Sequence, residues 1–108
     1  MKFTNDGQKI SFNYQDKIGG CVTYFPIRDG QTLVIEQVFV NPALRGQGMA
    51  QQLMIEMLNF AKQQNKKIYP LCPYARAYLK KHLEYQALIE NHSEAEVQKE
   101  KEKSNGSK

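Results

Sequence analysis

One amphipathic helical pattern between two apolar segments constrains the fold of this chain more than any other feature of its sequence. Residues 31–40 form a long, largely apolar segment, as expected of a strand covered on both faces, and residues 67–71 indicate a second, shorter strand. Between them, apolar residues recur at spacings of three and four from Met49 to Ala61, which predicts a surface helix with one buried face. A strand, a helix and a strand in this order predict two parallel neighbouring strands joined by a right-handed crossover.

The residues before this unit predict antiparallel strands. Apolar and polar residues alternate over residues 8–14, and a second strand pattern covers residues 21–27. We expect turns at residues 15–20, which contain two glycines, and at residues 28–30. Short connections of this kind favour a meander of neighbouring strands.

A second helix is predicted after the last strand. Pro73 suits the first position of a helix over residues 74–82, which places Cys72 at the N-cap. The sequence therefore predicts an α/β (α+β) fold with a mixed sheet. Its parts are antiparallel N-terminal strands, a β-loop-α-β unit and a C-terminal helix.

Charge and hydropathy divide the chain into two parts. The formal net charge of the 108 residues is +4, and all of it lies in residues 1–92, because four Glu and four Lys balance over residues 93–108. Val97 is the only large apolar residue of this last segment, too little to offset the entropy of ordering it. We expect one folded domain over residues 1–92 and a charged, disordered tail over residues 93–108.

The sequence has no pattern of a membrane, secreted or metal-binding protein. Its two cysteines, Cys21 and Cys72, occur without CxxC or His/Cys ligand spacing, and no apolar run is long enough to span a membrane. A signal-peptide pattern is also missing. We expect a cytoplasmic protein that has reduced thiols, no metal and no membrane partner.

The loop between the long strand and the amphipathic helix is the strongest functional signal. Residues 45–50 contain Gly46 and Gly48 and lead directly into the helix. Backbone N–H groups of such a turn, together with the positive end of the helix dipole, form a site for a phosphate or pyrophosphate. The two glycines could instead only shape a tight turn. Neither the G-x-G-x-x-G spacing nor the P-loop pattern is present, so nicotinamide and nucleoside-triphosphate chemistry lose support.

This segment resembles the acyl-coenzyme A signature of the GNAT acetyltransferase superfamily, which is Gln/Arg-x-x-Gly-x-Gly/Ala after a β-strand. Residues 45–50 (RGQGMA) match it, and residues 40–44 (VNPAL) match the pattern that precedes it. Cys72-Pro73, the following helix and residues 82–85 (HLEY) are similar to the end of the minimal GNAT-like proteins. The resemblance covers residues 8–90 and implies a truncated GNAT fold.

The resemblance implies acetyl-coenzyme A or coenzyme A as cosubstrate and an amine as acetyl acceptor. Backbone groups of the strand would pair with the amide arms of pantetheine, and N–H groups of the loop would hold the pyrophosphate. The residues implied in cosubstrate binding are Val38, Val40, Arg45, Gly46, Gln47, Gly48, Met49 and Ala50.

Cys72 is a candidate catalytic residue. The resemblance places the thioester beside the start of the segment that follows the second parallel strand, where Cys72 lies. A helix N-terminus stabilises a thiolate, and Arg76 one turn later could reinforce this effect. Cys72 could then accept the acetyl group or protonate the departing coenzyme A thiolate. The alternative is a buried, inert cysteine, which is also what we expect of Cys21 in the middle of a strand.

Glu36 is the second candidate catalytic residue. The resemblance implies an acid or water-holding residue on this strand that helps to deprotonate the attacking ammonium, since only a neutral amine can attack a thioester. Alternation predicts that Glu36 shares one face with Val34, Val38 and Val40, toward the cleft. The alternative is an ordinary exposed Glu. The minimal GNAT-like proteins have a His near here, where this chain has Glu36-Gln37.

Three functions remain open from the sequence. The first is an acetyl-coenzyme A-dependent N-acetyltransferase, and the second is a module that binds coenzyme A without turnover. The third is a nucleic-acid-binding domain, motivated by the basic residues Lys62, Lys66, Lys67, Arg76, Lys80 and Lys81. Such residues are more often solvated helix faces, and no recognised nucleic-acid-binding module is present.

Overall fold

The computed structural model describes residues 2–90, which form a mixed five-stranded sheet with two α-helices. The elements are β1 (Thr4–Asn5), β2 (Lys9–Tyr14), β3 (Lys17–Ile27), β4 (Thr32–Val40), a 3-10 helix (Pro42–Leu44), α1 (Met49–Gln63), β5 (Lys67–Pro70), α2 (Pro73–Lys81) and a second 3-10 helix (Leu83–Leu88). The predicted fold class is confirmed. The expected tail over residues 93–108, and the expected domain end at residue 92, lie outside the described residues.

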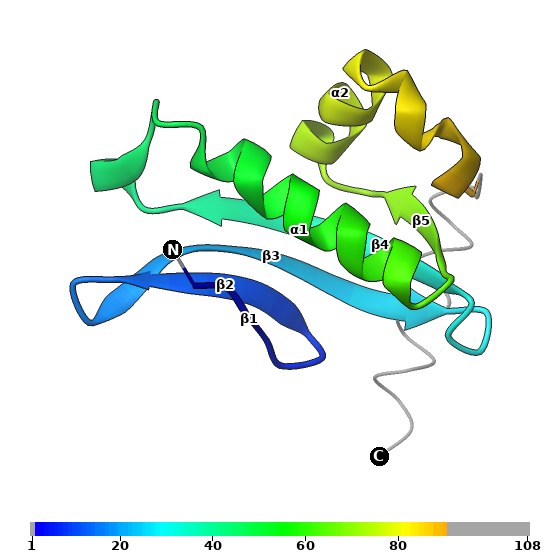
Figure 1. Ribbon diagram of the computed structural model, residues 1–108, viewed down its shortest axis with the longest axis horizontal. Helices are drawn as coiled ribbons and strands as arrows, with labels where there is room; N and C mark the ends of the chain where they lie inside the picture. The colour runs from blue at the N-terminus through cyan, green and yellow to red at the C-terminus, as the bar shows by residue number, and fades with distance from the viewer. Residues whose placement is uncertain (1, 91–108) are drawn as a thin grey trace.

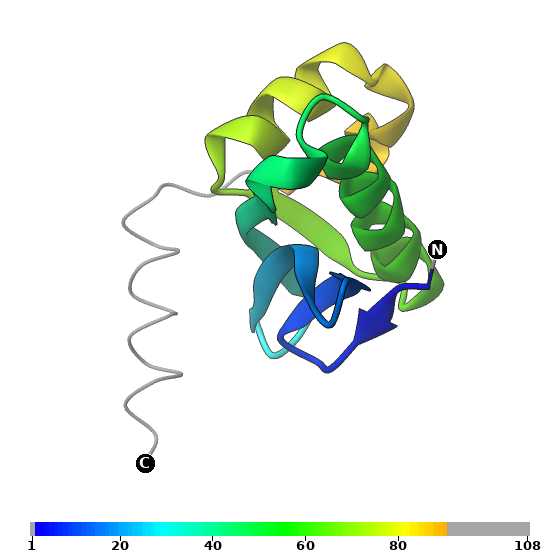
Figure 2. The ribbon, with the colours of Figure 1, turned by 90° about the vertical axis from the view of Figure 1, so that its left-hand side faces the viewer.

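The strands lie side by side in the order β1-β2-β3-β4-β5. The first three pairings are antiparallel, and β4 pairs with β5 in parallel, as the strand-helix-strand pattern predicts. Figure 1 shows α1 lying across one face of the sheet, with the chain turning from β5 into α2. The turned view in Figure 2 shows the same layer of strands covered by α1.

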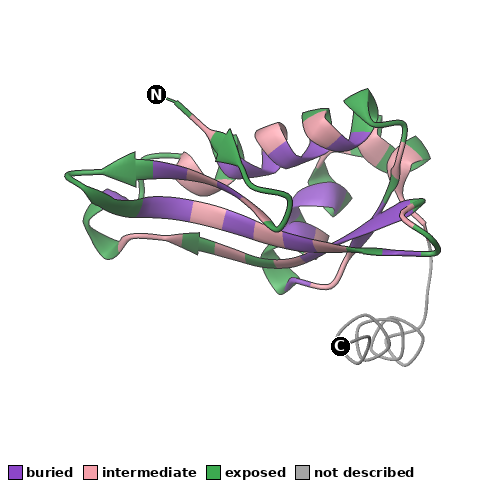
Figure 3. Ribbon diagram, turned by 90° about the horizontal axis from the view of Figure 1, so that it is seen from below, coloured by how far each residue is buried: buried purple, intermediate pink, exposed green. Residues whose placement is uncertain are grey.

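The two faces of the sheet differ in what covers them. The face under α1, here called the covered face, holds the main core, to which α1 contributes Leu53, Met54, Met57, Leu58 and Ala61. The opposite face, here called the open face, has a smaller buried cluster of Ile27, Val34 and Tyr69. Figure 3 shows buried residues on the side of α1 that faces the strands. The helix therefore folds onto the sheet by its apolar stripe, as its spacing predicts.

The expected turn at residues 15–20 is wrong in its length. Only Gln15 and Asp16 form the turn, with φ of 51° and 63°, and β3 begins directly after them. Gly19 and Gly20 therefore lie inside the strand, where a Cβ on Gly19 would come within 2.4 Å of the Phe12 ring. The two glycines make room for a buried ring on the neighbouring strand, which local turn signals do not reveal.

β4 contains a bulge at Glu36. Gln37 pairs with Thr23 of β3, whereas Ile35 pairs with the next residue, Tyr24, so Glu36 is the extra residue in this register. One extra residue reverses the alternation of side chains beyond it and bends the strand.

The bulge corrects the face assigned to Glu36. Val34 belongs to the open-face cluster, whereas Val38 and Val40 pack against the main core on the covered face. The expectation that these valines share one face with Glu36 is therefore wrong. Glu36 follows Ile35, whose side chain is in the main core, so alternation places Glu36 on the open face.

β4 and β5 pair over only part of β4. Their register runs from Thr32 beside Lys67 to Ile35 beside Pro70. The carbonyl of Ile35 then accepts hydrogen bonds from the N–H groups of residues 71 and 72, at 3.0 and 3.1 Å. Beyond this point the chain after β5 enters α2, while β4 continues with β3 as its one neighbouring strand among the described residues (Figure 1).

The segment after the second 3-10 helix returns to the outer edge of β5. Ile89 forms a parallel bridge with Ile68, and the Glu90 N–H donates to the Ile68 carbonyl at 2.8 Å. The Glu90 carboxylate accepts a hydrogen bond from the Thr32 hydroxyl and pairs with the Arg28 Nε at 3.2 Å. These contacts tie the end of the described chain to the sheet.

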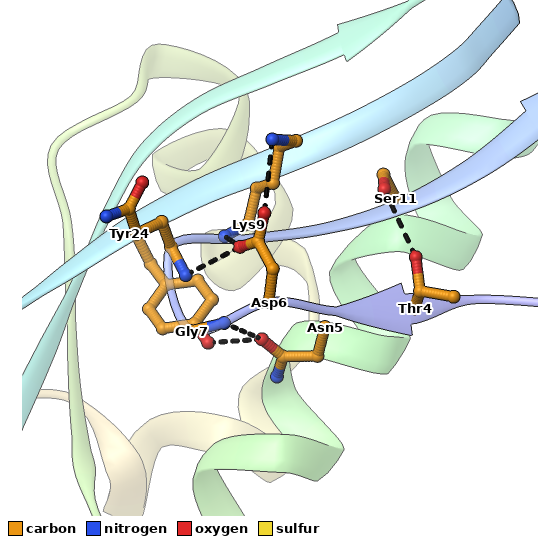
Figure 4. A network of polar contacts seen from close by, with 8 residues as sticks. Thr4, Asn5, Asp6, Gly7, Lys9, Ser11 and Tyr24 are labelled. Atoms are coloured by element: carbon orange, nitrogen blue, oxygen red, sulfur yellow. Dashed lines mark hydrogen bonds and ion pairs between the residues drawn. The ribbon is translucent and has the colours of Figure 1, made fainter.

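The short strand β1 was not predicted, and side chains hold it in place (Figure 4). The Asn5 Oδ1 accepts a hydrogen bond from the Tyr24 hydroxyl at 2.5 Å. The Asp6 Oδ1 accepts from the backbone N–H groups of Gln8 and Lys9, each at 2.9 Å. These hydrogen bonds lower the pKa of the Asp6 carboxyl from its ordinary value.

Candidate functional site

The second half of β4 presents backbone groups on the side away from β3. The Asn41 N–H donates to the Gly19 carbonyl of β3 at 2.8 Å, and the Val40 carbonyl accepts from the Arg45 Nε at 3.2 Å. In a strand, the N–H and C=O groups of one residue point to the same side, and those of the next residue point to the other side. The backbone groups of Val38 and Val40 therefore point away from β3, to the side where β5 has ended. We call residues 36–40 the free edge of β4.

The loop after β4 delivers the N-terminus of α1 to the same place. Gly46 and Gly48 have φ of 82° and 78°, the left-handed region that favours glycine. The first helical hydrogen bond runs from the Gln52 N–H to the Gly48 carbonyl at 3.1 Å, with no side-chain cap and no acidic residue in the first turn. The N–H groups of residues 49–51 thus have no acceptor within the helix, and the positive end of its dipole adds to them.

A pocket of about 520 Å³ joins the free edge to this helix end. Its walls are residues 37–40 of β4, loop residues 44–46, residues 48–51 and Tyr74 of α2. Val38 lies on the covered face and Phe39 on the open face, so the pocket follows the edge of β4 and reaches both faces. Arg45 is in the lining and no acidic residue is, which suits an anionic ligand.

Cys72 lies at the predicted N-cap of α2, with its N–H bonded to the Ile35 carbonyl and no side-chain cap hydrogen bond. It is 7% exposed and belongs to the main core, so the thiol is buried rather than open to solvent. Tyr74, two residues on, is 39% exposed and lines the pocket. Partial burial raises the pKa of the Tyr74 phenol, and the nearby Cys72 thiol raises it further.

Two arginines near the site make contacts that shape the backbone. The Arg76 Nε donates to the Pro70 carbonyl at 3.0 Å, at the point where β5 ends. The Arg45 N–H donates to the Pro42 carbonyl at 3.4 Å, so this amide of the expected pyrophosphate loop is engaged within the turn. The Arg45 Nε contact with Val40 fixes the guanidinium at the end of the free edge.

Comparisons with known proteins agree with this architecture. The family model of the GCN5-related N-acetyl-transferases matches residues 9–88. The chain belongs to this family. Among curated protein sequences no relative matches it.

Solved structures that are described as acetyltransferases show the same fold. A GCN5-like protein from Staphylococcus aureus superposes with a TM-score of 0.67 at 22% identity, over 86% of this chain and 91% of that one. An acetyltransferase of Elizabethkingia anophelis with acetyl-CoA bound has a TM-score of 0.54 at 23% identity, over 69% of this chain and 51% of that one. An acetyltransferase of Clostridium acetobutylicum with acetyl-CoA has a TM-score of 0.55 at 20% identity, covering 80% and 59%. This chain thus spans little more than half of the two structures that hold acetyl-CoA.

The pocket of this GCN5-related chain brings together most of the residues that the sequence singled out. Of the eight residues expected to bind the cosubstrate, all except Gln47 line it, whereas Glu36 and Cys72 do not. Sequence reasoning missed the other lining residues, which are Gln37, Phe39, Leu44, Gln51 and Tyr74. Tyr74 follows directly on the Cys-Pro pair that opens α2, and this position was the signal that could have placed it at the site.

The described part of this GCN5-related chain has no group of three or more His, Cys, Asp or Glu residues arranged to hold a metal ion. Within residues 2–90, no helix is long and apolar enough to cross a membrane.

Several of the basic residues that motivated nucleic-acid binding contact the protein itself. Lys67 donates to the Ala87 carbonyl at 2.7 Å, and Lys62 lies over the Tyr85 ring.

Proposed function

We propose that this protein is an N-acetyltransferase that takes its acetyl group from acetyl-coenzyme A. One observation carries the proposal: a single pocket joins a strand edge with outward-pointing backbone groups to an uncapped helix N-terminus. The strand edge suits the amide arms of pantetheine, and the helix N-terminus suits a pyrophosphate. Family membership and the fold shared with acetyl-CoA-bound structures support it.

The binding step uses backbone groups on both sides of the pocket. The free edge of β4 supplies the N–H and C=O groups of Val38 to the amide arms of the cosubstrate, as an added strand would. The N–H groups of Gly46 and of residues 48–51 face the pyrophosphate, and the Arg45 guanidinium adds positive charge. Bound acetyl-coenzyme A supplies an acetyl group activated as a thioester.

The transfer step needs a neutral amine and a protonated leaving group. Glu36, the first residue of the free edge, takes the proton of the acceptor ammonium, directly or through a water, and passes it to solvent. The amine nitrogen forms the new C–N bond and releases a second proton to solvent as it becomes an amide, while the C–S bond breaks. Because Cys72 is buried, we assign its thiol to donating a proton to the leaving sulfur rather than to carrying the acetyl group. Cys72 regains that proton from solvent.

A second function is favoured by one observation. Neither Glu36 nor Cys72 lines the pocket, which fits a module that holds coenzyme A without turnover. The two functions separate in one experiment. Coenzyme A stabilises the protein against heat in both cases, but free thiol is released from acetyl-coenzyme A in the presence of amines only if the protein is a transferase.

Variants at Cys72 separate the two roles of its thiol. Proton donation predicts that Cys72→Ala lowers kcat without changing coenzyme A binding, and that no acetyl group is found on the wild-type protein by intact mass after rapid quench. A Cys72-dependent mass increase of one acetyl group overturns the direct-transfer assignment. Cys21→Ala, at the other cysteine of the chain, is the matched control.

A further inference from the structure

A second cavity, of about 380 Å³, lies between the N-terminal segment and the later turns of α1. It shares no lining residue with the pocket at the free edge of β4, which contacts only the first turn of α1. We call this space the β1–α1 cavity. Its lining includes Phe3 and Asn5 of the N-terminal segment and Glu56, Asn59, Phe60 and Gln63 of α1.

Three polar side chains of α1 line the β1–α1 cavity along one side of the helix. Glu56, Asn59 and Gln63 are three and seven positions apart, which aligns them over about 10 Å of the helix axis. Glu56 is partly buried and is the only acidic residue of α1. Among the residues that the structure describes, none forms a hydrogen bond or ion pair with these three side chains. One carboxylate and two amides are therefore available to a ligand.

Aromatic rings and a fixed amide form the wall opposite these groups. Phe3 packs on Phe12 and Phe60 packs on Tyr24, in both cases with 5.6 Å between the ring centroids. The Asn5 Oδ1 accepts a hydrogen bond from the Tyr24 hydroxyl, as Figure 4 shows. Because these contacts lie within the protein, the wall is already in place before a ligand binds, which lowers the entropy cost of binding.

The charges around the β1–α1 cavity leave it with a net negative charge. Of the described residues, no Lys, Arg or His lines it. Asp6, which follows β1, pairs with Lys9 at 3.2 Å, so these two residues add no net charge. Lys62 lies over a tyrosine ring of the second 3-10 helix, and Lys2 lines a separate cavity. The Glu56 carboxylate therefore sets the sign of the charge that a ligand meets here.

These features select the chemistry of the ligand. An anion is repelled by Glu56, and an apolar molecule leaves the polar side chains without partners. A metal ion finds a single carboxylate, whereas hard cations require many oxygen ligands. An organic cation pairs with the carboxylate and also gains from contact with the aromatic rings. A guanidinium fits better than an ammonium, because its planar fork pairs with both carboxylate oxygens and its flat faces stack on rings.

We propose that the β1–α1 cavity binds a small molecule through its guanidinium group. Glu56 accepts two parallel hydrogen bonds from this group, and the amide oxygens of Asn59 and Gln63 accept from its remaining N–H groups. The rings of Phe3 and Phe60 contact its faces and the carbon chain attached to it. The volume of the cavity is in the range of small-molecule sites. This site is separate from the proposed acetyl transfer, and none of its tests needs acetyl-coenzyme A.

Titration of the full chain with propylguanidine, propylurea and propylamine, followed by amide chemical shifts, tests the proposal. At neutral pH propylguanidine is a planar cation, propylurea has nearly the same shape without the charge, and propylamine has the charge without the plane. We expect propylguanidine to bind with a Kd on the order of 1 mM. Propylurea should bind more weakly by about ten-fold or more, and propylamine by about two- to five-fold.

The position of the shifts locates the site. Propylguanidine should shift the side-chain amide signals of Asn59 and Gln63 and the backbone signals of residues 56–63, with little change at Val38 and Val40. Propylurea binding as tight as that of propylguanidine, or tighter binding of propylamine, overturns the proposal. Absence of propylguanidine binding at 20 mM, or shifts confined to other parts of the chain, also overturns it.

Two variants with opposite expected effects and one control test the role of the carboxylate. Glu56→Gln removes its charge with little change of shape and should weaken propylguanidine binding by about ten-fold or more. Asn59→Asp adds a second carboxylate at an exposed position and should strengthen binding by about three-fold or more. Asp16→Asn, in the turn before β3, changes the net charge as Glu56→Gln does and should leave binding unchanged. Unchanged binding in Glu56→Gln, or no gain in Asn59→Asp, overturns the proposal.

A fourth probe separates two sources of the same chemical group. N-acetyl-arginine methylamide carries a guanidinium on a short peptide backbone, as an arginine residue of a polypeptide does. Binding that is equal to or weaker than that of propylguanidine supports a small-molecule ligand. Binding that is tighter by about ten-fold or more, with added shifts outside the cavity, assigns the site to a polypeptide and overturns the small-molecule proposal.

Discussion

The two halves of β4 are continuous in one strand but have opposite surroundings. Residues 32–35 pair with β3 on one side and β5 on the other, and all four are buried. Residues 36–40 keep β3 and lose β5, and none of them is fully buried. The change occurs at Glu36, the bulged residue, where β4 and β5 part.

This difference shows how a small sheet can provide both a core and a binding edge. The buried half supplies the apolar side chains that hold α1 and β5, and the free half supplies backbone hydrogen-bonding groups that the sheet does not use. Exposed strand edges are ready to pair with an added chain. In this protein the edge lies beside a helix N-terminus, so an extended ligand that carries an anion fits both.

The largest expected effect is on stability, in the buried half. Ile35→Ala removes a fully buried side chain and should lower the free energy of unfolding by about 2–5 kcal/mol. Val38→Ala, in the free half, should cost less, because Val38 is partly exposed. Urea unfolding of both variants measures the difference. Equal losses would contradict the division of the strand.

Proline substitutions test the direction of the backbone groups. Phe39→Pro removes an N–H that points to β3, as that of Asn41 does, whereas Val38→Pro removes one that points to the free edge. Phe39→Pro should therefore be less stable than Val38→Pro by about 1–3 kcal/mol. Val38→Pro should instead weaken coenzyme A binding, by about three- to ten-fold for one hydrogen bond. If Val38→Pro were the less stable variant, the N–H of Val38 would point to β3 and that of Phe39 to the free side, which would contradict the assignment.

Two glycines with the same backbone strain separate binding from folding. Gly48 and Gly7 both have positive φ, and a Cβ at either one meets no atom within 4 Å. Changing either to Ala should cost about 1–2 kcal/mol, because both positions are left-handed. Only Gly48→Ala should weaken coenzyme A binding, measured by thermal shift relative to each unliganded variant. If Gly7→Ala weakened coenzyme A binding equally, the loop over residues 45–50 would not be part of the binding site.

The smallest expected effect is the part of the pH dependence of stability that comes from Asp6, a residue outside the free edge. The pKa of Asp6 is lower in the folded state than its ordinary value of 3.8, so its hydrogen bonds stabilise the protein above pH 3.8 and this contribution is lost as the pH falls through the folded pKa. Asp6→Asn should remove that part of the acid dependence and leave coenzyme A binding unchanged. Acid unfolding curves of the two proteins measure it, and identical curves would contradict the role of the Asp6 hydrogen bonds.

Local patterns were enough for the parts of the fold that depend on neighbours in sequence. The spacing from Met49 to Ala61 predicted α1, and Pro73 predicted the N-cap at Cys72, both of which the structure confirms. Features that depend on distant residues were not predictable. Gly19 and Gly20 lie in a strand because the Phe12 ring needs the space, which no turn propensity indicates.

The same limit applies to the site. The loop over residues 45–50 and its place before α1 followed from glycine spacing and helical periodicity. The face of the sheet on which Glu36 lies did not follow from the sequence, because the bulge is set by the register between β3 and β4. The burial of Cys72 and the exposure of Tyr74 also depend on how α2 packs on the core, which is a tertiary property.

Backbone amide chemical shifts during a titration with coenzyme A test the central claim most directly. We predict that the largest changes occur at Val38, at Val40 and at residues 46–51, with little change at β1 and β2. This result would show that the free edge and the helix end bind one ligand together. Changes confined to other elements, or changes in the loop without any at Val38 and Val40, would contradict the account.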